Sequence, residues 1–134
     1  MTRHQVFQWL VRRFPKGIID SDGLVRRFDG RRDFVAKLFR SSLDYYANTP
    51  NELRALLAEG NLEEIKRIAH GLKGTGGNLM APRLRELAQK VQGTSGEAFP
   101  ETREQVTELL LVLEVALKEC QFWLDSYNAE ANSA

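Results

Sequence analysis

Hydrophobic residues recur every three to four positions along most of this chain, and no segment shows the alternation with a period of two that marks a half-buried strand. This pattern predicts an all-α protein. The first apolar stripe, residues 6–14, stops at Pro15 and predicts a short helix. A second brief helix is expected over residues 24–28, where Gly30 closes it.

Longer periodic segments predict the main helices. Thr49 and Pro50 open one that stops at Gly60, and Asn61 with Glu64 three residues later signals the start of the next. Short connections between helices of this length favour antiparallel neighbours. We therefore expect an antiparallel four-helix bundle, with the additional short N-terminal helices capping one end. Its main helices are predicted at residues 32–47, 62–78, 82–92 and 101–127.

The segment IAHGLKGTGGNLM, residues 68–80, places four glycines inside a predicted helix. Each glycine in a helix interior costs roughly 0.5–1 kcal/mol relative to alanine, so the choice needs a reason. One arc of this helix is apolar and must face the core. It consists of Leu62, Ile65, Ala69, Leu72, Gly76 and Leu79. His70 lies about 140° from the centre of that arc, so its imidazole is predicted to face solvent.

The surface around His70 is predicted to be small and basic. Gly74 and Gly77 carry no side chain there and would let the surface of another protein approach the imidazole closely. Gly76, on the buried side, is expected to allow close contact with a neighbouring helix, whereas Gly71 has no assigned role. The residues around His70 on the exposed surface are Lys66, Arg67, Lys73, Gly74 and Gly77.

An exposed histidine can act as a nucleophile, a general base, a metal ligand or a pH sensor. Three nearby cations are expected to disfavour the imidazolium form and to stabilise an added phosphoryl group. We expect no metal site, because the other histidine is the distant His4 and Cys120 belongs to a buried stripe. No nucleophile stands beside a base and an orienting acid, which argues against a hydrolase. A histidine that only decorates a polar surface remains the alternative.

Composition limits the class of protein. The chain has 134 residues, 43 % hydrophobic and 28 % charged, with no apolar run approaching 18 residues. It is therefore expected to be one soluble globular domain, neither disordered nor membrane-inserted. The lone Cys120 cannot form an internal disulfide, and arginines interrupt the apolar residues of the N-terminus, unlike a secretory signal. A reducing, cytoplasmic location is expected.

The net charge of +1 conceals an asymmetry. Residues 1–40 carry ten Lys and Arg against four acidic residues, and the remainder carries nine against fourteen. A basic region of this kind could meet nucleic acid, an anionic membrane or an acidic protein surface. The other interpretation, in which the two halves balance within one fold, stays open.

The sequence AHGLKGTGGNLMAPRL closely resembles the A-H-x-L-K-G-x-x-x-x-x-G-x-x-x-L signature of histidine-containing phosphotransfer (HPt) domains of multistep two-component signalling. GIIDSDGLVRRFDGRRDFVAKLFRSSLDYY and LLAEGNLEEIKRIAH are also similar to that family, so the resemblance covers residues 17–127. It departs at Met80, where the family has glycine, and this leaves the shape of the following turn open. The resemblance implies an N-terminal extension helix at residues 1–16, an HPt four-helix bundle domain at 17–128 and a disordered tail at 129–134.

The resemblance also implies roles for individual residues. His70 corresponds to the phospho-acceptor, Lys73 to the basic residue beside it, and Gly74 to the glycine that leaves room for the partner. Gln92 stands where several family members have a glutamine near the histidine. Lys66, Arg67 and Gly77 complete the residues expected to stabilise the phosphoryl group or to contact the partner.

The implied function is to accept a phosphoryl group from the phospho-aspartate of a receiver domain and to pass it to a second receiver. We expect no cofactor of the chain's own, Mg²⁺ supplied by the receiver, no nucleic-acid partner and a monomer. There is no G-x-x-x-x-G-K-[ST] loop, so no ATP-dependent kinase activity is expected, whether the chain stands alone or belongs to a hybrid sensor kinase.

Two alternatives stay open at this point. One is the phosphotransfer module of a chemotaxis-type histidine kinase, phosphorylated by an ATP-binding domain. The other is a helical module that binds receivers without transferring, or that binds anions through Arg26, Arg27, Arg31 and Arg32.

Overall fold

A computed structural model of the chain describes residues 2–14, 17–95 and 99–133. Within these ranges no strand occurs, so the predicted all-α class is confirmed. The expected stop of the first helix at Pro15 lies outside the described residues. The helices are α1 (Arg3–Arg13), α2 (Ser21–Arg27), α3 (Arg32–Tyr46), α4 (Thr49–Glu59), α5 (Leu62–Asn78), α6 (Pro82–Gln92) and α7 (Phe99–Ser133).

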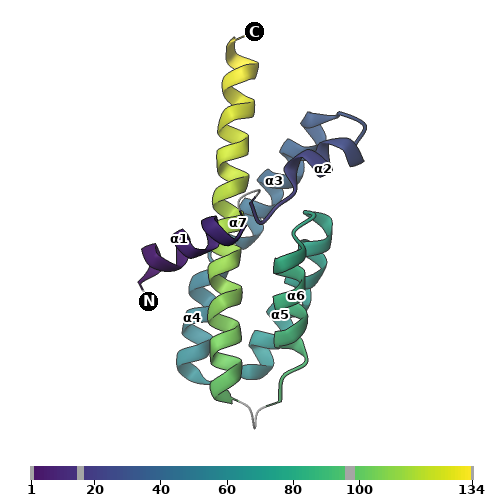
Figure 1. The fold of residues 1–134 in the computed structure, drawn as a ribbon. Coiled ribbons are helices and arrows are strands. Elements are labelled where there is room, and N and C mark those ends of the chain that lie inside the picture. The colour runs from purple at the N-terminus through teal and green to yellow at the C-terminus, as the bar shows by residue number, and fades with distance from the viewer. Residues whose placement is uncertain (1, 15–16, 96–98, 134) are drawn as a thin grey trace.

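The main helices follow an up-and-down path (Figure 1). α3 and α4 run one after the other in the same general direction, α5 returns, α6 runs back beside α5, and α7 returns along the length of the molecule. α7 contacts α3, α4 and α6, while α5 contacts α6 and α4. The buried apolar side chains of these helices form the core between them.

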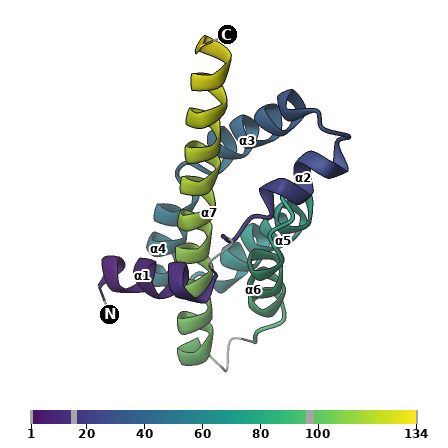
Figure 2. The same ribbon diagram turned by 45° about the horizontal axis from the view of Figure 1, so that its top comes forward.

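The predicted capping of one end by short helices is not confirmed. α4 contacts both α5 and α7, because its Leu53 and Leu57 are buried and give it a core-facing stripe of its own. α1 lies against α7 and crosses it between its two ends (Figure 2). α2 contacts α3 and lies next to the turn between α5 and α6, where the Asp20 N–H donates to the Met80 carbonyl at 3.0 Å.

Helix α5 begins and ends at the residues that its sequence predicts. The Asn61 side chain accepts a hydrogen bond from the Glu64 backbone N–H at 3.2 Å, which caps the first turn. The preceding Gly60 adopts φ +69°, a left-handed conformation that ends α4. Ile65, Ala69, Leu72 and Gly76 are buried, as the predicted arc requires.

α7 is longer than predicted. It continues to Ser133, so residues 129–133 are helical where a disordered tail was expected, and residue 134 lies outside the described ranges. Aromatic and ionic contacts with α3 explain the extension: the Trp123 ring meets Phe39 edge-on at 5.2 Å, and Arg32 forms an ion pair with Glu130. Sequence periodicity does not report such contacts between distant helices.

The single cysteine is part of the core. Cys120 is fully buried on α7, and burial together with the nearby Glu119 carboxylate raises the pKa of its thiol to about 12. The thiol therefore stays protonated and unreactive at neutral pH in the folded protein. In the ranges that the structure covers, no helix is both long and apolar enough to cross a membrane.

Candidate functional site

His70 lies in the middle of α5 with its side chain exposed to solvent. Its neighbours Ala69 and Leu72 are fully buried, which fixes the orientation of the helix about its own axis. The predicted exposure of the imidazole is therefore confirmed. Because α5 is held by its apolar stripe, His70 is presented by a packed helix and not by a loop.

The imidazole is held from the neighbouring helix. Nε2 of Gln92, the last residue of α6, lies 2.8 Å from Nδ1 of His70. No described residue forms a hydrogen bond with the other ring nitrogen, Nε2. The α5–α6 hairpin thus fixes the ring through its inner nitrogen and leaves the outer nitrogen accessible.

The glycines of α5 divide into open and closed positions. A Cβ atom added at Gly74 would meet nothing within 4 Å, and one added at Gly77 would meet only Nη1 of Arg85, at 3.9 Å. At Gly76 the added atom would lie 2.7 Å from the backbone nitrogen of Arg85, closer than real Cβ atoms come. The open positions follow His70 on its own surface, and the closed one lets α5 and α6 approach, as predicted.

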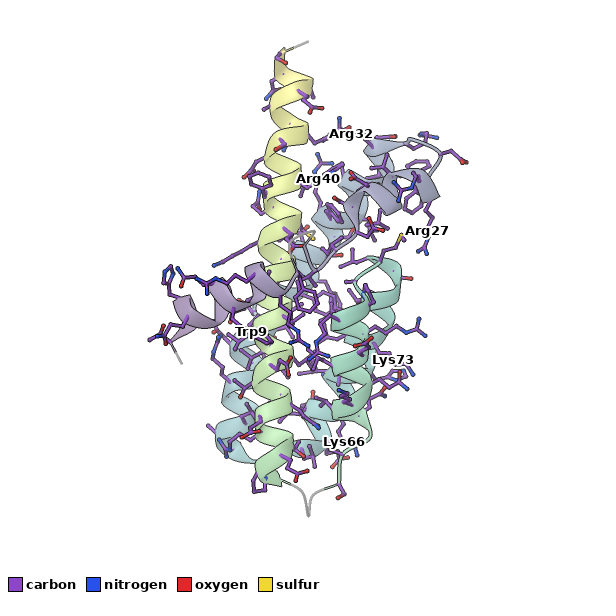
Figure 3. The ribbon with its side chains drawn as sticks, in the orientation of Figure 1. Trp9, Arg27, Arg32, Arg40, Lys66 and Lys73 are labelled. Atoms are coloured by element: carbon purple, nitrogen blue, oxygen red, sulfur yellow. The ribbon has the colours of Figure 1, made fainter. Side chains whose placement is uncertain are left out.

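The three predicted cations do not all surround the imidazole. Lys66 donates to the backbone carbonyl of Thr94 at 2.7 Å, and Arg67 forms an ion pair with Glu64. This pairing raises the pKa of Arg67 and lowers that of Glu64. No described residue pairs with Lys73, which lies on the side of the hairpin away from α7, whereas Lys66 lies nearer the loop end (Figure 3). Lys73 is therefore the cation that stays available beside His70.

Comparison with protein families places this geometry in context. The sequence model of the Hpt domain matches residues 37–119. The chain belongs to the Hpt domain family. Such domains carry out histidine phosphotransfer in the phosphorelays of two-component signalling. The match contains His70, Lys73, Gly74 and Gln92, and it omits α1 and α2. Comparisons with curated proteins and with solved structures give no match.

A hydrogen-bonded chain that the sequence did not reveal supports helix α5 of this Hpt domain. The hydroxyl groups of Tyr46, on α3, and Thr75, on α5, lie 2.5 Å apart. The Thr75 hydroxyl is also 3.1 Å from the Gly71 carbonyl, and a Cβ at Gly71 would come within 3.8 Å of the Tyr46 hydroxyl. The glycine-rich part of α5 is thereby tied to α3. In the sequence pattern Tyr46 counts only as one of the periodic apolar residues of its helix, so no sequence signal indicated this contact.

Met80 is the position at which the sequence departs from the HPt signature. Its φ is +51°, in the left-handed region where glycine is favoured. The Ala81 N–H donates to the Gly76 carbonyl at 2.8 Å, and the Met80 carbonyl accepts from the Asp20 N–H at 3.0 Å. The turn between α5 and α6 is left-handed here even though its residue is methionine.

The four arginines considered for anion binding are not equivalent. Arg31 forms an ion pair with Asp33, and Arg32 pairs with Glu130 and lies 5.3 Å from the centre of the Trp123 ring. Both are engaged within the fold. Arg26 and Arg27 are exposed on α2, and no described residue forms an ion pair with either. The structure thus does not gather the four into one anion site.

Proposed function

We propose that this Hpt domain is a phosphorelay intermediate in which Nε2 of His70 takes a phosphoryl group from the phospho-aspartate of one receiver domain and delivers it to a second. The observation that carries this proposal is the relation of three residues. His70 is exposed, Gln92 engages its Nδ1, and the surface beyond it is open at Gly74. A nucleophile of this kind needs a fixed ring, a free nitrogen and room for a partner.

The proposed step is an in-line displacement at phosphorus. The lone pair of His70 Nε2 attacks, the N–P bond forms, and the bond from phosphorus to the aspartyl oxygen breaks. The electron pair leaves with the receiver's carboxylate. Nε2 has a lone pair when the ring proton is on Nδ1. That tautomer requires the Gln92 amide to turn its carbonyl oxygen toward Nδ1–H, in place of the amide nitrogen Nε2 that lies 2.8 Å from Nδ1 in the structure.

This chain would supply the nucleophile, the orientation of its ring and a positive charge. Lys73, one turn from His70 and free of described partners, would compensate the negative charge of the transferred group. Lys66 and Arg67 are engaged elsewhere, so we assign them to the shape of the surface and not to the phosphoryl group. The divalent ion that assists phosphoryl transfer would be Mg²⁺ held by the receiver.

The finer structural proposals follow from the same assignment. We propose an antiparallel four-helix bundle in which α3 and α4 together form one side and α5, α6 and α7 the others. Residues 17–128 would form the phosphotransfer domain, with α1 as an extension. We also propose a monomer in a reducing, cytoplasmic setting, which agrees with a single cysteine that is buried and unpaired.

The deciding experiment is phosphotransfer from a panel of receiver domains labelled on aspartate. We expect label to move to an acid-labile, base-stable site, and His70→Gln to abolish the transfer. His4→Gln, the same change at an exposed histidine on α1, is the matched control and should transfer normally. Circular dichroism should show that both variants keep their helices. Equal labelling of His70→Gln would overturn the proposal.

The same assay separates the alternatives. A chemotaxis-type module would be labelled by an ATP-binding kinase domain and not by a receiver. A receiver-binding module without transfer activity would bind wild type and His70→Gln with equal affinity and would carry no label.

A further inference from the structure

A hollow of about 300 Å³ lies beside the end of the acceptor helix, where α2 meets the α5–α6 turn. Gly76 and Gly77 of α5 form part of its wall, and Met80 lies at the turn. Arg27 of α2 and Arg85 of α6 line it from two different helices. Figure 3 shows Arg27 extending from α2 toward the top of the hairpin.

Both arginines are available for a ligand. Arg27 and Arg85 are exposed, and no described side chain forms a hydrogen bond or ion pair with either. Nη1 of Arg85 is the nearest atom to the Cβ position of Gly77, at 3.9 Å, so its guanidinium lies over the open side of α5. The missing side chain at Gly77 therefore makes the space that this guanidinium borders.

The carboxylate that lines the same hollow is already used. Asp20 Oδ1 accepts the Gly23 N–H at 2.9 Å and caps α2, and the Asp20 backbone is bonded to the α5–α6 turn. Its charge is directed to the helix N-terminus, where it offsets the helix dipole. The two guanidinium groups leave the hollow positively charged.

The neighbouring hollow gives a contrast within the same region. It is lined by Arg26 and Arg83, but also by three carboxylates, those of Asp20, Asp22 and Glu86. Arg83 is paired with Glu86 and with Glu108. Carboxylates outnumber arginines there, whereas in the hollow at Gly77 two arginines face one carboxylate, so the excess of positive charge belongs to the hollow at Gly77.

The hollow lies on the surface that a phosphoryl donor must cover. Gly77 follows His70 by seven residues, which is two helical turns, so both face the same side about 10 Å apart along α5. Gly74 stands open between them. A protein surface that brings a phosphoryl group to His70 and lies flat along α5 would reach Arg85 and Arg27.

We propose that this arginine hollow, formed by Arg27 and Arg85 over Gly77, binds a carboxylate side chain of the docked receiver and so selects which receivers exchange phosphoryl groups with His70. The inference rests on the proposed function and adds a specificity site to it. Guanidinium groups bind carboxylates through paired N–H donors, and such contacts across an interface govern the choice of partner and the rate of encounter.

The first test uses charge reversal with a matched control. Arg27→Glu and Arg85→Glu should each raise KM for the phosphorylated receiver about fivefold to tenfold, while kcat changes less than about twofold, because the contact is remote from phosphorus. Arg26→Glu makes the same charge change on the same helix but lines the neighbouring hollow, and it should leave KM within about twofold. Thermal unfolding checks that each variant is folded.

The second test identifies the receiver group. Each surface Asp and Glu of the receiver is replaced by Arg and assayed with Arg85→Glu. One such change should restore at least half of the loss in kcat/KM, and the same receiver variant should be impaired with the wild-type chain. If no receiver carboxylate rescues the variant, or if Arg27→Glu and Arg85→Glu keep the wild-type KM, the hollow is not a docking site.

The two proposals fail in different ways. If Arg27→Glu and Arg85→Glu keep the wild-type KM while His70→Gln is inactive, the docking role of the hollow is refuted and the phosphotransfer proposal stands. Transfer by His70→Gln would remove the phosphotransfer proposal whatever the arginine variants do.

Discussion

Nδ1 of His70 and Nε2 of Gln92 lie 2.8 Å apart across the α5–α6 hairpin. His70 carries the imidazole ring, and Gln92 limits its rotation. Their helices, α5 and α6, pack closely at Gly76. The contact turns an exposed and otherwise rotatable side chain into a directed one. Which ring nitrogen carries the proton is therefore coupled to whether the uncharged Gln92 amide turns its NH2 group or its carbonyl oxygen toward Nδ1.

Gln92→Ala should therefore slow phosphotransfer without weakening receiver binding. Loss of one hydrogen bond of about 1 kcal/mol lowers kcat about fivefold, and KM should stay close to the wild-type value. Gln89→Ala, an exposed glutamine one turn earlier on α6, is the matched control and should transfer at the wild-type rate. Rapid-quench transfer from a labelled receiver measures both constants. A Gln92→Ala variant with unchanged kcat would show that Gln92 does not orient the ring.

Gly74 and Gly76 should respond in opposite ways to the same substitution. Gly74→Ala meets no neighbouring atom and should stabilise the protein by about 0.5–1 kcal/mol through helix propensity. Gly76→Ala places its Cβ against the Arg85 backbone and should destabilise the protein by about 1–3 kcal/mol. Urea unfolding measures both free energies.

A larger residue at Gly74 should separate function from stability. Gly74→Leu fills the open surface beside His70 and should lower kcat/KM for the receiver by about tenfold or more, because a partner displaced by a side chain no longer reaches the ring. Its free energy of unfolding should not fall below that of wild type. Normal transfer by Gly74→Leu would mean that the partner approaches His70 from another side.

The sequence predicted the parts of this site that one helix determines. Periodicity alone placed Ala69 and Leu72 inside and His70 outside, because all three lie on the same packed helix. The Asn61 cap and the close approach at Gly76 were also predicted, since each follows from a residue type at a helical position.

Contacts between distant segments were not predictable in this way. Lys66 turns to the Thr94 carbonyl and Tyr46 meets Thr75, and the two partners in each case are nearly thirty residues apart. A long basic side chain can reach several acceptors, so its position on a helix does not choose among them. For the same reason the expected ring of three cations is reduced to Lys73.

Met80 should be a position where glycine is more stable than alanine. Both Met80→Gly and Met80→Ala lose the packing of the methionine side chain, whose Cε lies close to Gly23. Only glycine also relieves the left-handed backbone, which costs other residues roughly 1–2 kcal/mol. Urea unfolding should therefore rank Met80→Gly above Met80→Ala by about 1 kcal/mol, the reverse of the order in a helix interior. The ordinary order, alanine above glycine, would contradict the left-handed turn.

Glu119 holds the segment between α1 and α2 against α7. Its two carboxylate oxygens each accept a backbone N–H at 2.9 Å, one from Ile18 and one from Ile19. A Cβ at Gly17 would lie only 3.0 Å from Oε1, so the chain approaches the carboxylate closely. Burial raises the pKa of Glu119 above its ordinary value of 4.5, and the two N–H donors oppose that shift without cancelling it.

The raised pKa of Glu119 sets the sign of a pH effect on stability. The folded state binds this proton more tightly than the unfolded state, so the contribution of Glu119 is fully present below pH 4.5 and is lost as the pH rises through the folded-state pKa. Glu119→Gln cannot ionise. The free energy of unfolding of wild type minus that of Glu119→Gln should therefore decrease between about pH 4 and pH 8, measured by urea unfolding at each pH. A difference that grows with pH would mean that the N–H donors outweigh burial and that the pKa is lowered in the folded state.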